Sequence, residues 1–121
     1  MPQKNWRDQW DDHATEESEK FMKMPVAELL AQFRAGKLGE YYVIWKAIGE
    51  RAKLQDIGWE LYDFLNSYRE YLPRYHCAGA LLKLMNSTAF TQVELSGKQA
   101  PVAANLKKLK AMLEEKIGPR K

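Results

Sequence analysis

Apolar side chains recur at helical spacing along most of this chain. Intervals of three or four residues separate them in three long stretches: Tyr41, Ile44, Ile48 and Ala52; Leu61, Leu65, Tyr68 and Leu72; Val102, Leu106, Leu109, Leu113 and Ile117. Such spacing places side chains on one face of an α-helix. We therefore expect helices at about 4–13, 15–23, 25–35, 40–53, 59–71, 74–86 and 101–117.

Helix-start and helix-stop residues support these boundaries. Prolines, which fit a first helical turn, stand just ahead of three periodic stretches, at Pro25, Pro73 and Pro101. Glycines, which suit helix ends and turns, flank such stretches at Gly36, Gly58, Gly97 and Gly118. Thr15, followed by two glutamates, is typical of an N-cap. The β-branched stretch 88–95 would also suit a short strand, but we favour a helix because no partner strand is evident.

Two segments of the chain align with each other as an internal repeat. Residues 27–33 match 59–65 at an offset of 32, and residues 41–49 match 74–82 at an offset of 33. The extra residue falls between the two helices, where an insertion costs little. Each unit is therefore expected to be a helix, a turn and a second helix, although two unrelated amphipathic helix pairs would also give partial matches.

The second unit resembles a HEAT or armadillo-type helical repeat. Its second helix has the family's basic residue, its small pair and its Ala-Leu pair, at Arg74, Cys77, Ala78, Ala80 and Leu81. Small side chains allow a helix to lie close to its neighbours. The first unit keeps Ala47, Ile48 and Gly49 but has Tyr41, Ile44 and Trp45 at the basic and small positions. Both units are shorter than the usual ~40 residues.

We predict a single all-α domain, a right-handed α-α superhelix-like stack of six or seven helices; an irregular helical bundle is the alternative. Two repeats at 25–86 would form the centre, with N-terminal capping helices at 1–24 and a linker and C-terminal capping helix at 87–121. Caps are expected because two units rarely bury a continuous core.

Composition narrows the class of protein. The chain has 121 residues, 45% of them apolar, which is enough for one compact core. Its formal net charge of +3 conceals a gradient: residues 1–19 sum to −4 and residues 98–121 to +5. The apolar stretches are too short to cross a bilayer, and the N-terminus is too acidic for a signal or transit peptide. We expect a cytoplasmic protein that does not enter membranes.

Candidate chemistry is sparse. The single cysteine, Cys77, rules out an intrachain disulfide and lies among small apolar residues, so we expect a buried structural thiol. The acidic run around His13 has metal-ligand residue types, but we interpret it as a solvated helix face. His76 has no evident catalytic partner, and nucleotide or flavin fingerprints are absent. No cofactor, no metal and no enzymatic activity are expected, although a helical enzyme subunit completed by another chain stays open.

The leading hypothesis is a non-catalytic protein-interaction or adaptor module, acting on a protein partner or by self-association. Its binding face would use the second helices and two N-terminal tryptophans: Tyr42, Lys46, Arg74, Tyr75, His76, Trp6 and Trp10. Docking onto the first repeat would also explain the two tryptophans. The alternative is a nucleic-acid-binding helical module that uses the basic C-terminal half: Arg69, Lys83, Lys107, Lys108 and Lys110. Glutamates interrupt that basic patch, so an ordinary charged surface also explains it.

Overall fold

A computed structural model describes residues 6–67, 70–97 and 100–120, with the backbone alone for 6–14 and 100. This part of the chain forms seven α-helices and no strand, which confirms the predicted all-α class. The helices are α1 (Trp6–Lys23), α2 (Val26–Arg34), α3 (Val43–Arg51), α4 (Leu54–Ser67), α5 (Tyr71–Met85), α6 (Gln92–Ser96) and α7 (Ala100–Ile117).

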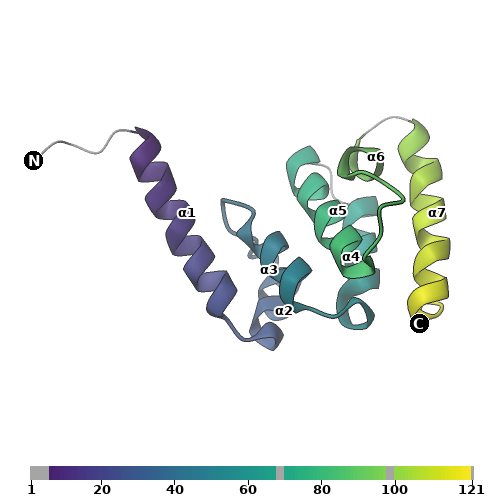
Figure 1. Cartoon of the computed structure of the whole chain (residues 1–121), viewed down its shortest axis with the longest axis horizontal. Coiled ribbons are helices and arrows are strands. Elements are labelled where there is room, and N and C mark those ends of the chain that lie inside the picture. Colours follow the sequence, from purple (N-terminus) through teal and green to yellow (C-terminus); the bar gives the residue numbers. More distant parts are fainter. Residues whose placement is uncertain (1–5, 68–69, 98–99, 121) are drawn as a thin grey trace, which may run out of the picture.

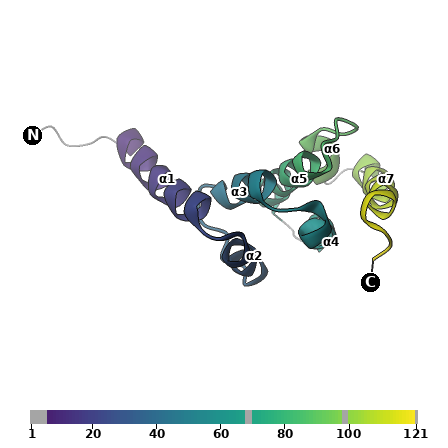
Figure 2. The same cartoon turned by 60° about the horizontal axis from the view of Figure 1, so that its bottom comes forward.

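The helices form an elongated array with α1 at one end and α7 at the other (Figures 1 and 2). The two predicted units become two helix pairs, α2 with α3 and α4 with α5. Helix α3 packs against α5, while α2 meets α4 through the Phe33 and Phe64 rings and the Arg34–Glu60 ion pair. Helix α1, which contains the acidic residues of 1–19, and α7, which contains most of the basic residues of 98–121, therefore lie at opposite ends of the array.

One continuous core runs through the array. Each of the seven helices contributes buried side chains to it, and α1 does so through its second half, where side chains are described. Examples are Phe21, Leu29, Ile48, Leu61, Leu81, Leu95 and Leu109. The aligned repeat positions Leu29 and Leu61 are both completely buried, as are Ile48 and Leu81. The spacing used for the prediction thus identified many of the core residues, but it also included Leu72, which is exposed.

Several helix boundaries differ from those predicted. The expected helices 4–13 and 15–23 are one helix, α1, so Thr15 lies inside a helix and is no N-cap. Helix α3 begins at Val43 rather than at residue 40, because Tyr42 has a left-handed backbone with φ 62°. Within 88–95, a helix forms only from Gln92, where Thr91 and Glu94 make a reciprocal capping box.

Gly58 was wrongly predicted to mark a helix end. Helix α4 begins at Leu54, and Gly58 is buried in its interior. A Cβ at this position would lie 3.2 Å from Cδ1 of Ile117, near the C-terminal end of α7. The missing side chain therefore allows α7 to pack on α4, and the ion pair between Arg120 and Asp63 joins the same two parts of the chain.

Candidate functional site: the groove between α3 and α5

The two second helices, α3 and α5, approach each other closely. A Cβ on Gly49 of α3 would lie 3.3 Å from Cα of Ala80 on α5, a tight contact for that pair of atoms. Small residues at this crossing bring the two backbones together. The side chains that flank the crossing are thereby held at fixed positions.

An aromatic stack lies at one end of this crossing. The ring of Tyr42, directly before α3, stacks on the His76 ring of α5 with centroids 4.3 Å apart and planes 15° from parallel. Tyr75 meets the edge of His76, and Tyr71 lies against Tyr75. The four rings form a continuous aromatic surface, of which Tyr71 is 40% exposed.

Two hollows adjoin the stack: they share Tyr42 and Trp45 in their walls, and His76 lines the smaller one. The larger, about 480 Å³, is lined by Gly36, Lys37, Leu38, Gly39, Glu40, Tyr42, Trp45, Glu70 and Pro73. The smaller, about 180 Å³, is lined by Tyr42, Trp45, Lys46, Gly49, His76, Gly79, Ala80, Lys83 and Gln92. We call the two hollows together the α3–α5 groove.

The loop before α3 shapes the larger hollow and presents Tyr42. Its backbone turns through left-handed conformations at Gly36, Gly39 and Tyr42. An aromatic residue rarely adopts a positive φ, and such strain is often found at binding sites. The loop also contacts helix α1, through the side chain of Glu17.

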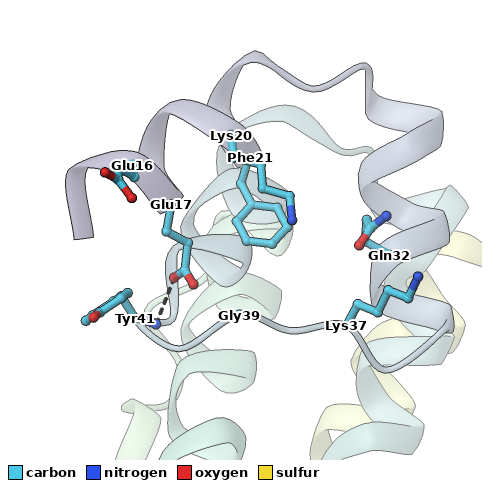
Figure 3. A pocket seen from close by; sticks show the side chains of 8 residues that line it. All are labelled: Glu16, Glu17, Lys20, Phe21, Gln32, Lys37, Gly39 and Tyr41. Carbon is cyan, nitrogen blue, oxygen red and sulfur yellow. Dashed lines mark hydrogen bonds between the residues drawn. The ribbon is translucent and has the colours of Figure 1, made fainter. Parts of the chain in front are cut away.

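Glu17 of α1 fixes the loop. Its carboxylate accepts hydrogen bonds from the backbone N–H groups of Glu40 at 2.5 Å and Tyr41 at 2.7 Å. Figure 3 shows the hydrogen bond to Tyr41 beside a further hollow of about 510 Å³, where the Phe21 ring lies between α1 and the loop. Arg51 of α3 also donates to the Phe21 carbonyl at 3.1 Å. Helix α1 is thus tied to both the loop and α3.

Helix α6 closes the other end of the groove. The Gln92 side chain donates to the Tyr75 carbonyl at 3.1 Å and lies over Gly79. A Cβ on Gly79 would collide with the amide nitrogen of Gln92. This glycine is therefore required for the contact between α5 and α6 in its present form.

The structure brings together four of the seven predicted partner-binding residues. Tyr42, Lys46 and His76 line the groove, and Tyr75 supports the stack. Arg74 does not belong to this surface, because it is only 8% exposed. Its guanidinium donates to the Leu65 carbonyl at 2.9 Å and the Gly97 carbonyl at 3.3 Å, so it joins α5 to the last turns of α4 and to the C-terminal end of α6. The side chains of Trp6 and Trp10 lie outside those described.

The basic residues of the alternative hypothesis are not gathered in one patch. Lys83 belongs to the groove and pairs with Glu50 at 3.3 Å. Lys107, Lys108 and Lys110 are exposed on α7 at the far end of the array (Figure 1), and Arg69 lies outside the described residues. Glu114 and Glu115, seven residues beyond Lys107 and Lys108, share their faces of the helix. The exposed surface of α7 therefore carries both positive and negative side chains.

Two titratable groups in and under the groove, His76 and Cys77, favour their neutral forms. Partial burial lowers the pKa of His76 below its ordinary value of 6.5, so its ring is neutral at pH 7. Burial raises the pKa of Cys77 well above the usual range, although nearby Arg74 opposes this, and the thiol contacts the Leu61 carbonyl at 3.4 Å. The expected buried thiol is thus confirmed. Among the residues whose side chains are described, no group of three potential metal ligands occurs.

Sequence reasoning missed three residues that shape the groove: Glu17, Gly79 and Gln92. Gln92 was part of the ambiguous stretch 88–95, and Glu17 appeared only as one acid in a charged run. The signal for Gly79 was present, since a glycine inside a predicted helix indicates a close approach. Nothing local to the sequence indicates that Glu17 bonds to a loop more than twenty residues away.

Comparison with known proteins gives no family for this chain: a scan of protein-family models, a search of curated proteins and a search of solved structures each found no match. The resemblance to HEAT or armadillo-type repeats therefore stays a prediction. Within the described ranges, no helix combines the length and apolar character needed to cross a membrane.

Proposed function

We propose that this protein is a non-catalytic protein-interaction module and that the α3–α5 groove binds a peptide segment of a partner protein. The observation that carries the proposal is the ring of Tyr42, which stacks on His76 and lines both hollows. Aromatic side chains held rigidly beside pockets are the usual anchors of protein interfaces.

The presence of two hollows with shared walls favours a peptide over a small molecule. The two hollows meet at Tyr42, so a bound chain can occupy both while its middle residues contact the aromatic surface. The exposed first turn of α5 extends this surface, with Leu72 50% exposed beside Tyr71. The resemblance to HEAT-like repeats also implies a binding face built from second helices, which here are α3 and α5.

The alternative, a nucleic-acid-binding module, has weaker support. Phosphate binding needs a cluster of basic side chains with few acids. Lys107 and Lys108 each share a face of α7 with a glutamate, and Lys83 lies on another helix, α5, where it pairs with Glu50. A salt series with a fluorescent single-stranded oligonucleotide tests this hypothesis, since binding through phosphates weakens steeply as salt rises.

The cellular setting that we propose is the cytoplasm, with the partner a protein or a second copy of this chain. A lone, fully buried cysteine is ordinary for a protein of a reducing compartment.

Selection from a random library of displayed nine-residue peptides tests the proposed function directly. The bait is the wild-type chain, and each enriched peptide is then measured against Tyr42→Gly. Glycine accepts the positive φ at this position, so the variant removes the ring without adding backbone strain. We expect the affinity for selected peptides to fall about tenfold or more.

Val93→Ser is the matched control, because Val93 is 56% exposed on α6 and does not line the groove. It should leave peptide affinity unchanged. Enriched peptides that bind Tyr42→Gly as well as the wild type, or a selection that yields no specific peptide, would overturn the proposed function.

A further inference from the structure

The smaller hollow of the α3–α5 groove differs in charge from the larger one. Its lining contains Lys46 and Lys83, on opposite sides of the helix crossing, and neither Asp nor Glu. The larger hollow is lined by Lys37 together with Glu40 and Glu70. A ligand that lies along the groove therefore meets a basic environment at one end and a mildly acidic one at the other.

The lysines of the smaller hollow have charge available for a ligand. Lys46 is exposed and has no ion-pair partner among the residues whose side chains are described. Lys83 makes a single contact with Glu50 at 3.3 Å, and its side chain is 56% exposed. An exposed pair of this kind contributes little stability, so a ligand carboxylate can replace Glu50 at small cost.

The other polar groups of the hollow agree with an anionic ligand. The amide of Gln92 donates one hydrogen bond, to the Tyr75 carbonyl, and an amide nitrogen has two protons to donate. The ring of His76 also lines the hollow, and a neutral imidazole carries one N–H donor. Two lysine ammonium groups attract an anionic side chain, and a carboxylate is the anion that an unmodified peptide carries at neutral pH.

We infer that the smaller hollow binds the carboxylate of an Asp or Glu side chain in the partner peptide, between Lys46 and Lys83. This inference rests on the proposed peptide-binding function and fixes the direction of the peptide, with its acidic residue toward α6. The Tyr42–His76 stack then contacts the residues next to that acid.

The test uses the peptides selected on the wild-type chain, synthesised with their own sequence and with every acidic residue changed to its amide. We expect acidic residues to be enriched in the selection. Lys46→Gln/Lys83→Gln should weaken binding of the acidic peptides about tenfold and leave the amide versions unchanged, because two exposed ion pairs are lost. Lys107→Gln/Lys108→Gln, on α7, is the matched control and should change neither.

The outcomes separate the two proposals. Peptides that depend on Tyr42 but bind the lysine double variant normally would overturn the carboxylate site while leaving the peptide groove standing. Peptides that also lose affinity in the α7 control variant would show a general charge effect and overturn the site as well. If a phosphoserine peptide binds at least tenfold tighter than its glutamate version, the ligand of the smaller hollow is a phosphate and the carboxylate assignment is wrong. Tight binding of an oligonucleotide through the same lysines would overturn the assignment of a peptide ligand.

Discussion

The carboxylate of Glu17 accepts a hydrogen bond from the backbone N–H of Tyr41 at 2.7 Å, one residue before the ring that stacks on His76. Helix α1 thereby holds the loop that presents Tyr42, although α1 does not line the groove itself. The shape of the groove depends on a contact between segments that are far apart in the sequence.

Replacing Glu17 should loosen this loop. Glu17→Ala leaves two backbone N–H groups without their charged acceptor, and we expect a loss of about 1–2 kcal/mol in the free energy of unfolding. Urea unfolding measures the loss, and hydrogen exchange at Glu40 and Tyr41 should become faster. Glu19→Ala, on the exposed side of the same helix, is the control. Equal effects of the two variants would show that the contact stabilises nothing.

Gly79 and Gln92 should show energetic coupling. In the wild type, Gly79→Ala forces the Gln92 amide away from the Tyr75 carbonyl, and the lost hydrogen bond offsets the gain in helix propensity. In a Gln92→Ala background nothing opposes the new methyl group, so the same change should stabilise the fold by about 0.5–1 kcal/mol. A double-mutant cycle by urea unfolding measures the difference. Additive effects would contradict the predicted contact.

His76 should make the fold less stable in acid. Its pKa is lowered in the folded state, so between that value and 6.5 the unfolded chain binds more protons than the folded one. Stability therefore rises with pH through this window and is reduced below it. The urea midpoint should fall more between pH 7.5 and pH 5 for the wild type than for His76→Gln. An equal fall in both proteins would assign the pH dependence to other groups.

Helix α7 should be essential for the stability of the array. It buries Val102, Leu106, Leu109 and Leu113, and Leu109 is completely buried. Leu109→Ala should cost about 2–5 kcal/mol, whereas Lys108→Ala on the exposed face should change little. Deleting residues 98–121 should lower the melting temperature further. An unchanged melting temperature in the truncated chain would show that α7 is not a cap.

The fold class and the core could be predicted because helical periodicity is a local signal. Leu61 and Leu65 lie on the buried side of α4 as their spacing indicates. Helix ends were less predictable, since Gly58 resembles a stop signal although packing against Ile117 explains it. Tyr42 and His76 were predicted to share a binding face, but their stacking and the hollows beside them depend on the close crossing of α3 and α5.

Arg74 shows the main limit of sequence reasoning about the site. A basic residue at the start of a repeat helix fits a binding face and a structural role equally well until its neighbours are known. The carbonyls of Leu65 and Gly97 that accept from its guanidinium lie 9 and 23 residues away in the chain. Only the folded structure brings these two acceptors together, so the role of Arg74 is to hold parts of the fold in place rather than to bind a partner.

The most direct test of peptide binding is a ¹⁵N–¹H NMR titration of the wild-type chain with a selected acidic peptide. The account predicts chemical-shift changes concentrated at Tyr42, Lys46, His76, Lys83 and Gln92, and their loss in Tyr42→Gly. Changes centred on α7, or changes that persist unaltered in Tyr42→Gly, would contradict it.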